Sequence, residues 1–194
     1  MKTAIALSLA AALSLAGTAY AQTSAQGQSS GSQAGTQAGK VDRDTQKFFE
    51  QAAVGGMAEV QTGKLAAEKA TNPEVKKFGE MMVQDHTKSN EEMMQLATKL
   101  GVTPPAELDR EHKRMQEKLT KASGAEFDRE YIAGQVKDHK KMIDLHEKQA
   151  KDGKNPEVKQ HAEKMLPSLR EHLKMAQDIE KQLKSDKGAG KGTS

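Results

Sequence analysis

Four polar side chains interrupt stripes of apolar residues at helical spacing, and their chemical types suit a metal site. His86, His139 and His172 fall among the apolar residues of three separate segments. Glu59 falls in a fourth segment, which is rich in small apolar residues. Imidazole and carboxylate groups that converge in the core of a helical bundle are typical of metal-binding proteins. A set of three histidines and one glutamate suits Zn, Cu, Fe or Ni better than Ca or Mg.

The distance of these residues from a repeated turn sequence predicts that they lie at one level. The sequence Asn-Pro-Glu-Val-Lys occurs twice, and each copy joins two long helical segments. Glu59 and His86 lie almost equally far before and after the asparagine of the first copy. His139 and His172 lie almost equally far before and after the asparagine of the second copy. At a rise of about 1.5 Å per residue these separations are about 20 Å and about 25 Å, near the middle of each helix.

A buried polar layer without a metal is the simpler interpretation of the same four residues. Buried polar groups need hydrogen-bond partners, and the carboxylate of Glu59 could accept hydrogen bonds from the histidines. We therefore keep two interpretations open, a polar layer and a site for one transition-metal ion such as Zn, Cu or Fe.

The residues around the histidines do not match the common di-iron signature. That signature needs Glu-x-x-His on two helices and a Glu on each of the other two. The residues three positions before the three histidines are Val83, Val136 and Leu169. The sole acidic residue three positions before a histidine is Asp109, before His112 in a connecting segment. Di-iron oxidation chemistry is therefore not expected.

Ten methionines and three further histidines raise the question of a copper site. Thioethers bind Cu(I). Methionine is also an ordinary filler of irregular helical cores, and we favour that interpretation. The further histidines belong to no convergent set. The residues singled out are eight of the methionines, Met57, Met81, Met82, Met93, Met94, Met142, Met165 and Met175, and the three histidines His112, His146 and His161.

Hydrophobic periodicity and turn residues predict four long helices and one short helix. Apolar residues recur at i, i+3, i+4 and i+7, and no strand-like alternation occurs. The two hairpins implied by the repeat predict an all-α, ferritin-like antiparallel four-helix bundle. The connection at 101–124 could run back along the bundle or pack across one end. The expected helices are 42–70, beginning at Asp42 or Asp44, and 72–100, 106–121, 123–151 and 155–184.

Capping residues mark the ends of these segments. Asn72 and Asn155 suit N-cap positions, because each precedes a proline and then a glutamate in the first turn. Gly101 suits the position after a helix C-terminus. Ser123 and Glu126 have the spacing of a capping box.

The two ends of the chain are predicted to lie outside the bundle. Lys2, the apolar run 4–16 and the small-x-small site at 19–21 predict a signal peptide over residues 1–21. Residues 22–41 are rich in Gln, Ser, Gly, Ala and Thr, and residues 185–194 are rich in Gly, Ser and Lys, which predicts a flexible linker and a flexible tail. The bundle is therefore expected at 42–184, in a protein exported to the periplasm or outer cell envelope.

Composition excludes several classes of function. The formal net charge is +3, and acidic and basic residues are interspersed rather than clustered. Aromatic residues make up 3% of the chain, so nucleic-acid binding through basic clusters and stacking aromatics is not expected. No segment after the signal peptide is apolar enough to span a membrane. With no cysteine and no phosphate-binding glycine loop, nucleophilic and nucleotide chemistry lack a motif.

The region 42–184 resembles an exported, ferritin-like bacterial domain of unknown function that is often labelled an outer membrane protein. That resemblance implies a ferritin-like bundle in the periplasm or outer envelope and no established activity. It rests on Glu59-Val60, Phe78 through Asp85-His86, Phe127-Asp128, Tyr131, His139, Leu166-Pro167 and His172.

These observations favour a non-catalytic module that binds a ligand or associates with the cell envelope. The specific hypothesis for this module is that it binds a metal ion through Glu59, His86, His139 and His172. A metal-dependent envelope oxidoreductase is the alternative from another class, and a purely structural or interaction bundle is a third. The sequence identifies no partner protein.

Overall fold

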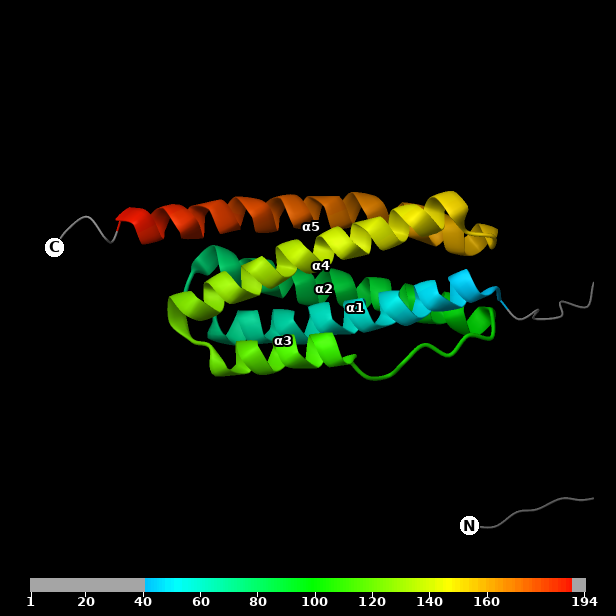
Figure 1. Cartoon of the computed structure of the whole chain (residues 1–194), viewed down its shortest axis with the longest axis horizontal. Coiled ribbons are helices and arrows are strands. Elements are labelled where there is room, and N and C mark those ends of the chain that lie inside the picture. The colour runs from blue at the N-terminus through cyan, green and yellow to red at the C-terminus, as the bar shows by residue number, and fades with distance from the viewer. Residues whose placement is uncertain (1–40, 190–194) are drawn as a thin grey trace, which may run out of the picture. The chain divides into compact units, whose positions relative to one another are not determined.

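The computed structural model describes residues 41–189, and these residues form five helices and no strand (Figure 1). The all-helical expectation is therefore confirmed for this part of the chain. The predicted signal peptide, the linker up to residue 40 and the last five residues of the predicted tail lie outside the described residues. The helices are α1 (Arg43–Lys69), α2 (Pro73–Lys99), α3 (Arg110–Lys121), α4 (Gly124–Asp152) and α5 (Pro156–Ala189).

The four long helices lie side by side as two hairpins. α1 packs mainly against α2, and α4 packs mainly against α5 (Figure 1). The hairpins meet through contacts of α1 with α4 and of α2 with α5. Figure 1 shows the connection from α2 running back along the helices, so that α2 and α4 point the same way. α3 lies in this connection and packs on α1 and α4, which is the first of the two paths that the sequence allowed.

The asparagine-proline turns are built as the sequence predicts. The side chain of Asn72 accepts hydrogen bonds from the backbone N–H groups of Glu74 and Val75. Asn155 accepts the equivalent pair at the start of α5. Asp42 rather than Asp44 caps α1. These caps satisfy N–H groups that have no partner within the helix, so each turn directs the start of the next helix.

The start of one helix and the cap of another differ from the prediction. α3 begins at Arg110 rather than residue 106, because the side chain of Asp109 accepts a hydrogen bond from the His112 N–H and caps the helix there. Ser123 is the N-cap residue of α4, but its side chain makes no capping hydrogen bond, so the predicted capping box is wrong. Gly124 begins α4 with a φ of 55°, a conformation that glycine adopts without steric cost.

The C-terminal helix is longer than expected. α5 continues to Ala189, whereas the sequence predicted its end at Lys184 and a tail from 185. Lys184 pairs with Glu180 one turn earlier, and the first glycine after it is Gly188. Such i, i+4 ion pairs stabilise an exposed helix, and they help to explain why α5 continues past the residues that pack in the core.

Two apolar clusters fill the core on either side of the polar level. The first holds residues near the α1–α2 turn together with the end of α3, the start of α4 and the second half of α5: Ala66, Val75, Phe78, Met82, Leu119, Ala122, Phe127, Tyr131, Ile132, Ala176 and Ile179. The second holds residues near the opposite end: Phe48, Phe49, Ala52, Ala53, Met93, Ala97, Val158 and Ala162. On every long helix the polar residue of interest lies between the two clusters, so the core is divided by a polar layer.

Close backbone contact and one buried carboxylate hold the first hairpin in place. A Cβ atom added at Gly79 would lie 2.6 Å from the Ala66 Cβ, so α1 and α2 approach too closely for a side chain there. Asp128 of α4 is buried and accepts hydrogen bonds from the Thr71 N–H, the Thr71 hydroxyl and the Asn72 N–H. This carboxylate therefore joins the second hairpin to the turn of the first.

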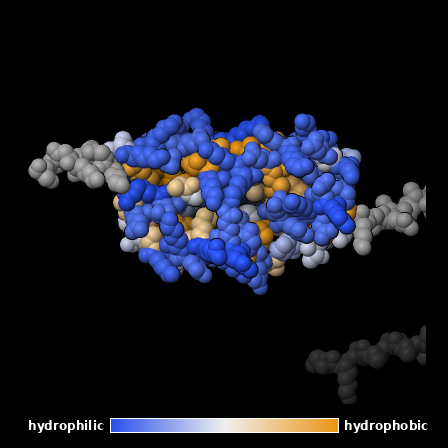
Figure 2. All heavy atoms as spheres, viewed as in Figure 1, coloured by the Kyte–Doolittle hydropathy of each residue, from blue (hydrophilic) through white to orange (hydrophobic). Residues whose placement is uncertain are grey.

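The surface is mostly hydrophilic. Figure 2 shows polar side chains over most of the visible face, with apolar groups in strips between them. Among the described residues Met94 is the large hydrophobic side chain that stands out as exposed, at 43%. None of the described helices combines the length and hydrophobicity that crossing a membrane would require.

Candidate metal centre

Three of the four predicted residues meet in the polar layer. His86 of α2, His139 of α4 and His172 of α5 are each at most 4% exposed. One potential ligand atom from each histidine lies within 4.8 Å of the corresponding atoms of the other two. The ring centroids are 5.6, 5.5 and 5.4 Å apart in the three pairs. These three side chains therefore lie together at one level of the bundle.

Hydrogen bonds fix which nitrogen of two rings carries the proton. Nδ1 of His139 lies 3.1 Å from the carbonyl oxygen of Gln135, and Nε2 of His172 lies 3.0 Å from Oδ2 of Asp85. Because carbonyl and carboxylate oxygens only accept, these nitrogens donate. The opposite nitrogens, Nε2 of His139 and Nδ1 of His172, then carry lone pairs. This is how metal-ligating histidines are normally oriented.

One ring nitrogen of each of the three histidines is buried and has no hydrogen-bond partner. These atoms are Nε2 of His86, Nε2 of His139 and Nδ1 of His172. Buried polar atoms without partners are rare in folded proteins, and each one calls for a physical reason. Here three of them, one per histidine, occur in a single cluster.

Burial keeps these imidazoles in the form that binds metals. Desolvation lowers the pKa of His139 to about 4, with a further contribution from His172. The pKa of His86 lies well below its ordinary value, first because of burial and then because of the neighbouring histidines. Burial also lowers the pKa of His172, although the hydrogen bond to Asp85 opposes that shift. All three rings are therefore neutral at pH 7, as metal coordination requires.

Glu59 lies beside this cluster rather than within it. Its Oε2 accepts a 2.6 Å hydrogen bond from Nε2 of Gln135, and its Oε1 lies 3.6 Å from Nδ1 of His139. The carboxyl group thus faces the side of His139 opposite to the unpartnered nitrogen. Burial raises the pKa of Glu59 to about 8, so the group is largely protonated at neutral pH. The structure places the predicted fourth ligand next to His139 but outside the group of three.

Two residues of the site were missed in the sequence. Gln135 holds both His139 and Glu59, and Asp85 holds His172 from a different helix. The position of Gln135, one turn before His139 on α4, is a signal that the sequence contained. Asp85 gives no such signal, because its contact with α5 depends on the rotation of two helices about their axes.

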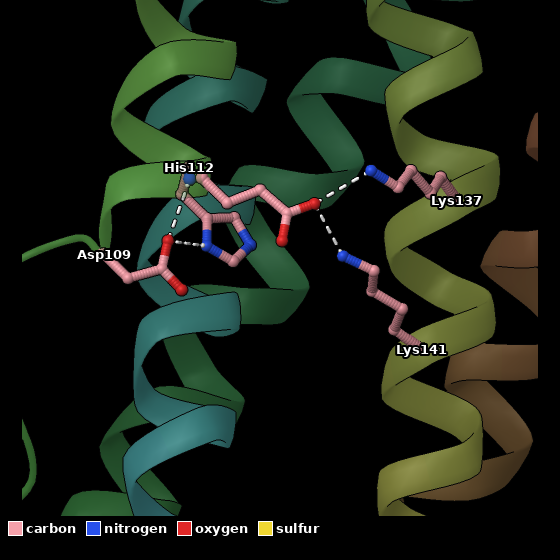
Figure 3. Close-up of polar contacts among 5 residues, drawn as sticks. Asp109, His112, Lys137 and Lys141 are labelled. Carbon is pink, nitrogen blue, oxygen red and sulfur yellow. Dashed lines mark hydrogen bonds and ion pairs between the residues drawn. The ribbon is translucent and has the colours of Figure 1, made fainter.

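Asp109 caps α3 and contacts the side chain of His112 in the first turn of that helix (Figure 3). Oδ1 of Asp109 lies 2.8 Å from Nδ1 of His112. Glu111 accepts hydrogen bonds of 2.8 Å from Lys137 and 2.7 Å from Lys141, both on α4. A cavity of about 330 Å³ between α1, α4 and this segment is lined by residues that include His112 and Glu59. It therefore extends from the start of α3 to the carboxyl group beside His139.

Solved structures with the same fold extend over most of this chain. A DUF305 fragment from Deinococcus radiodurans matches with a TM-score of 0.64 at 12% identity, over 73% of this chain and 98% of its own. A DUF305 protein from Streptomyces coelicolor, described as secreted, matches with a TM-score of 0.62 at 11% identity, over 72% and 92%. CopM in its Cu(II)-bound form matches with a TM-score of 0.62 at 20% identity, over 71% and 96%. At these identities the likeness establishes the fold alone.

The sequence comparison identifies the family. No curated protein matches the sequence significantly. The sequence pattern of one family matches residues 30–179, which include α1 to α4 and most of α5. The expectation of a domain of unknown function is thereby confirmed, and the chain belongs to the DUF4142 family of domains of unknown function.

Proposed function

We propose that this protein is an exported, ferritin-like four-helix bundle that binds one transition-metal ion through His86, His139 and His172. The observation that carries the proposal is the set of three buried, unpartnered ring nitrogens on three different helices. The predicted signal peptide supports export, and so does the likeness to a Streptomyces coelicolor protein described as secreted. We assign the protein a binding role rather than a catalytic one.

A metal ion accounts for the three nitrogens better than a polar layer does. The ring protons of His139 and His172 are already donated to Gln135 and Asp85, so the other nitrogen of each ring can only accept. His86 has one N–H to offer through Nε2 and can satisfy one of them at most. A single cation satisfies all three nitrogens together.

The ligand chemistry favours a transition metal over Ca or Mg. Imidazole nitrogen suits Zn, Cu, Fe and Ni, whereas Ca and Mg prefer oxygen ligands. The likeness to CopM in its Cu(II)-bound form supports Cu(II) as the first ion to test. Glu59 supports the site from outside: a cation beside His139 favours the charged form of this carboxyl group, so metal binding should release its proton.

Metal titration of variants tests this function. Untagged protein is stripped with a chelator and titrated with Cu(II) and with Zn(II) against a chromophoric competitor. We expect about one tight equivalent for the wild type and for His112→Ala, because His112 lies on α3 outside the centre. His139→Ala, checked by circular dichroism for retained helix, should lose that equivalent. Stoichiometric binding that persists in His139→Ala, or a wild type that binds neither ion, would overturn the proposal.

A further inference from the structure

A second cavity lies in the core between the three histidines and the second apolar cluster. Its volume is about 20 Å³, room for one water-sized species and too little for an organic ligand. All four long helices contribute to its walls. Six of the lining side chains carry sulfur or imidazole nitrogen: Met93, Met142, Met165, His86, His146 and His161.

The sequence builds this cavity by repeating the histidine layer at a spacing of seven. Seven residues are close to two helical turns, so the repeated position lies on the same helix stripe about 10 Å further along. Because α5 runs opposite to α2 and α4, the displacement has the same direction in space on all three helices. The pairs are His86 with Met93, His139 with His146, and His172 with Met165.

Small residues on α1 let side chains of α2 and α4 lie against its backbone near this cavity. Ala52, seven positions before Glu59, and Gly56 line the cavity from α1. A Cβ atom at Gly56 would lie 1.9 Å from Oδ1 of Asn90, and one at Gly55 would lie 2.8 Å from Sδ of Met142. The thioether of Met142 is therefore seated directly against the α1 backbone.

A hydrogen bond fixes which ring nitrogen of His146 carries the lone pair. Nδ1 of His146 lies 2.7 Å from the carbonyl oxygen of Met142 and must donate to it, so Nε2 carries the lone pair. His146 and Met93 are each 4% exposed. Burial lowers the pKa of His146 to about 4, which keeps the ring neutral at pH 7.

We propose that this cavity is a Cu(I) site formed by the three thioethers and the imidazole of His146. Thioether sulfur is a soft ligand that selects Cu(I) over Zn(II) and over hard cations. The site is distinct from the three-histidine centre in its ligands and in the oxidation state it prefers. It does not depend on metal binding by that centre, although His86 lines both.

Silver and copper binding to methionine variants tests the site. Ag(I) serves as a redox-inert substitute for Cu(I), and Cu(I) itself is titrated anaerobically against a bicinchoninate competitor. The full-length protein holds one equivalent of Zn(II), so that the three-histidine centre is occupied. The test variant carries Met93→Leu and Met165→Leu together, since leucine nearly conserves the side-chain volume. The control carries Met81→Leu and Met175→Leu, which lie on the same two helices in the other apolar cluster.

We expect the wild type and the control variant to bind one equivalent of Ag(I) or Cu(I). The test variant should bind it at least about 100-fold more weakly, because losing even an outer partner of a metal ligand costs about 10- to 100-fold. X-ray absorption of the Cu(I) form should show sulfur neighbours. A wild type that binds neither monovalent ion tightly, an unchanged affinity in the test variant, or a Cu(I) spectrum without sulfur would overturn the proposal.

A further variant separates this proposal from the proposed function. His139 does not line the second cavity. His139→Ala should therefore retain the Ag(I) equivalent even though it loses the divalent ion. A wild type that binds Ag(I) but neither Zn(II) nor Cu(II) would contradict only the three-histidine centre, and loss of Ag(I) binding in His139→Ala would overturn the independence of the second site.

Discussion

Asp85 on α2 accepts a 3.0 Å hydrogen bond from Nε2 of His172 on α5. This contact between the hairpins sets the tautomer of His172 and leaves Nδ1 as its buried lone pair. Asp85→Ala should therefore weaken divalent-metal binding by about 10- to 100-fold, as expected for an outer partner of a ligating histidine. Competition titration measures the effect, with Asp144→Ala as a matched exposed control on α4. Equal affinities in the two variants would show that Asp85 does not orient a ligand.

The carboxyl group of Glu59 predicts a loss of stability at alkaline pH in the metal-free protein. Its pKa is about 8 in the folded protein, against an ordinary value of 4.5, so the folded state binds more protons between these limits. The protonated carboxyl group therefore makes its full contribution to the free energy of unfolding below pH 4.5, and that contribution is lost as the pH rises through 8. In Glu59→Gln the new side chain has nearly the shape of glutamate, but its amide group cannot ionise. It should therefore be more stable than the wild type at pH 9, by several kcal/mol at most.

Urea unfolding at pH 6 and pH 9 measures that difference. Between these two values the stability of the wild type should fall relative to that of Glu59→Gln. Parallel behaviour of the two proteins across this range would mean that Glu59 is not held protonated by its surroundings.

The buried histidines predict the opposite trend in acid. The pKa of His139 and of His146 is about 4 in the folded protein, against an ordinary value of 6.5, mainly because of burial. Between pH 4 and pH 6.5 the unfolded chain therefore binds more protons than the folded protein. The free energy of unfolding keeps its full value above pH 6.5 and decreases as the pH falls below it. We expect a loss of at least about 2 kcal/mol between pH 7 and pH 5. The measurement is urea unfolding of metal-free Glu59→Gln, which removes the opposing contribution of Glu59, and a flat profile would contradict the burial of neutral imidazoles.

Substitution of Asp128 should change the stability of the protein through its hydrogen bonds alone. Its carboxylate accepts three hydrogen bonds from Thr71 and Asn72 at the α1–α2 turn. Asp128→Ala should lower the free energy of unfolding by about 2–3 kcal/mol, because buried donors lose a charged acceptor. Asp144→Ala, at an exposed position, should change it by less than about 0.5 kcal/mol. Urea denaturation compares the two, and equal stabilities would remove Asp128 from the contacts that join the hairpins.

The sequence was most informative where structure depends on local rules. Asn72 and Asn155 cap helices through contacts within three residues, and a fixed rise per residue allowed His86, His139 and His172 to be placed at one level. The all-helical structure followed from the same local information.

What the sequence did not predict depends on rotation and side-chain rotamers. Glu59 was placed at the correct level, but which side of the His139 ring it would face could not be read from spacing. His146 was not assigned to any group of converging ligands, although it lies seven residues after His139 on the same face of the helix. That spacing becomes informative only when Ala52 and Met93 are seen to border the same cavity.

The most direct test of the central claim is anomalous diffraction from crystals grown with one equivalent of Cu(II) or Zn(II). The proposed centre predicts one strong anomalous peak among the ring nitrogens of His86, His139 and His172. The peak should lie about 2.0–2.1 Å from Nε2 of His86, Nε2 of His139 and Nδ1 of His172. A metal peak elsewhere in the molecule, or a three-histidine layer that stays free of anomalous signal at saturating metal, would contradict it.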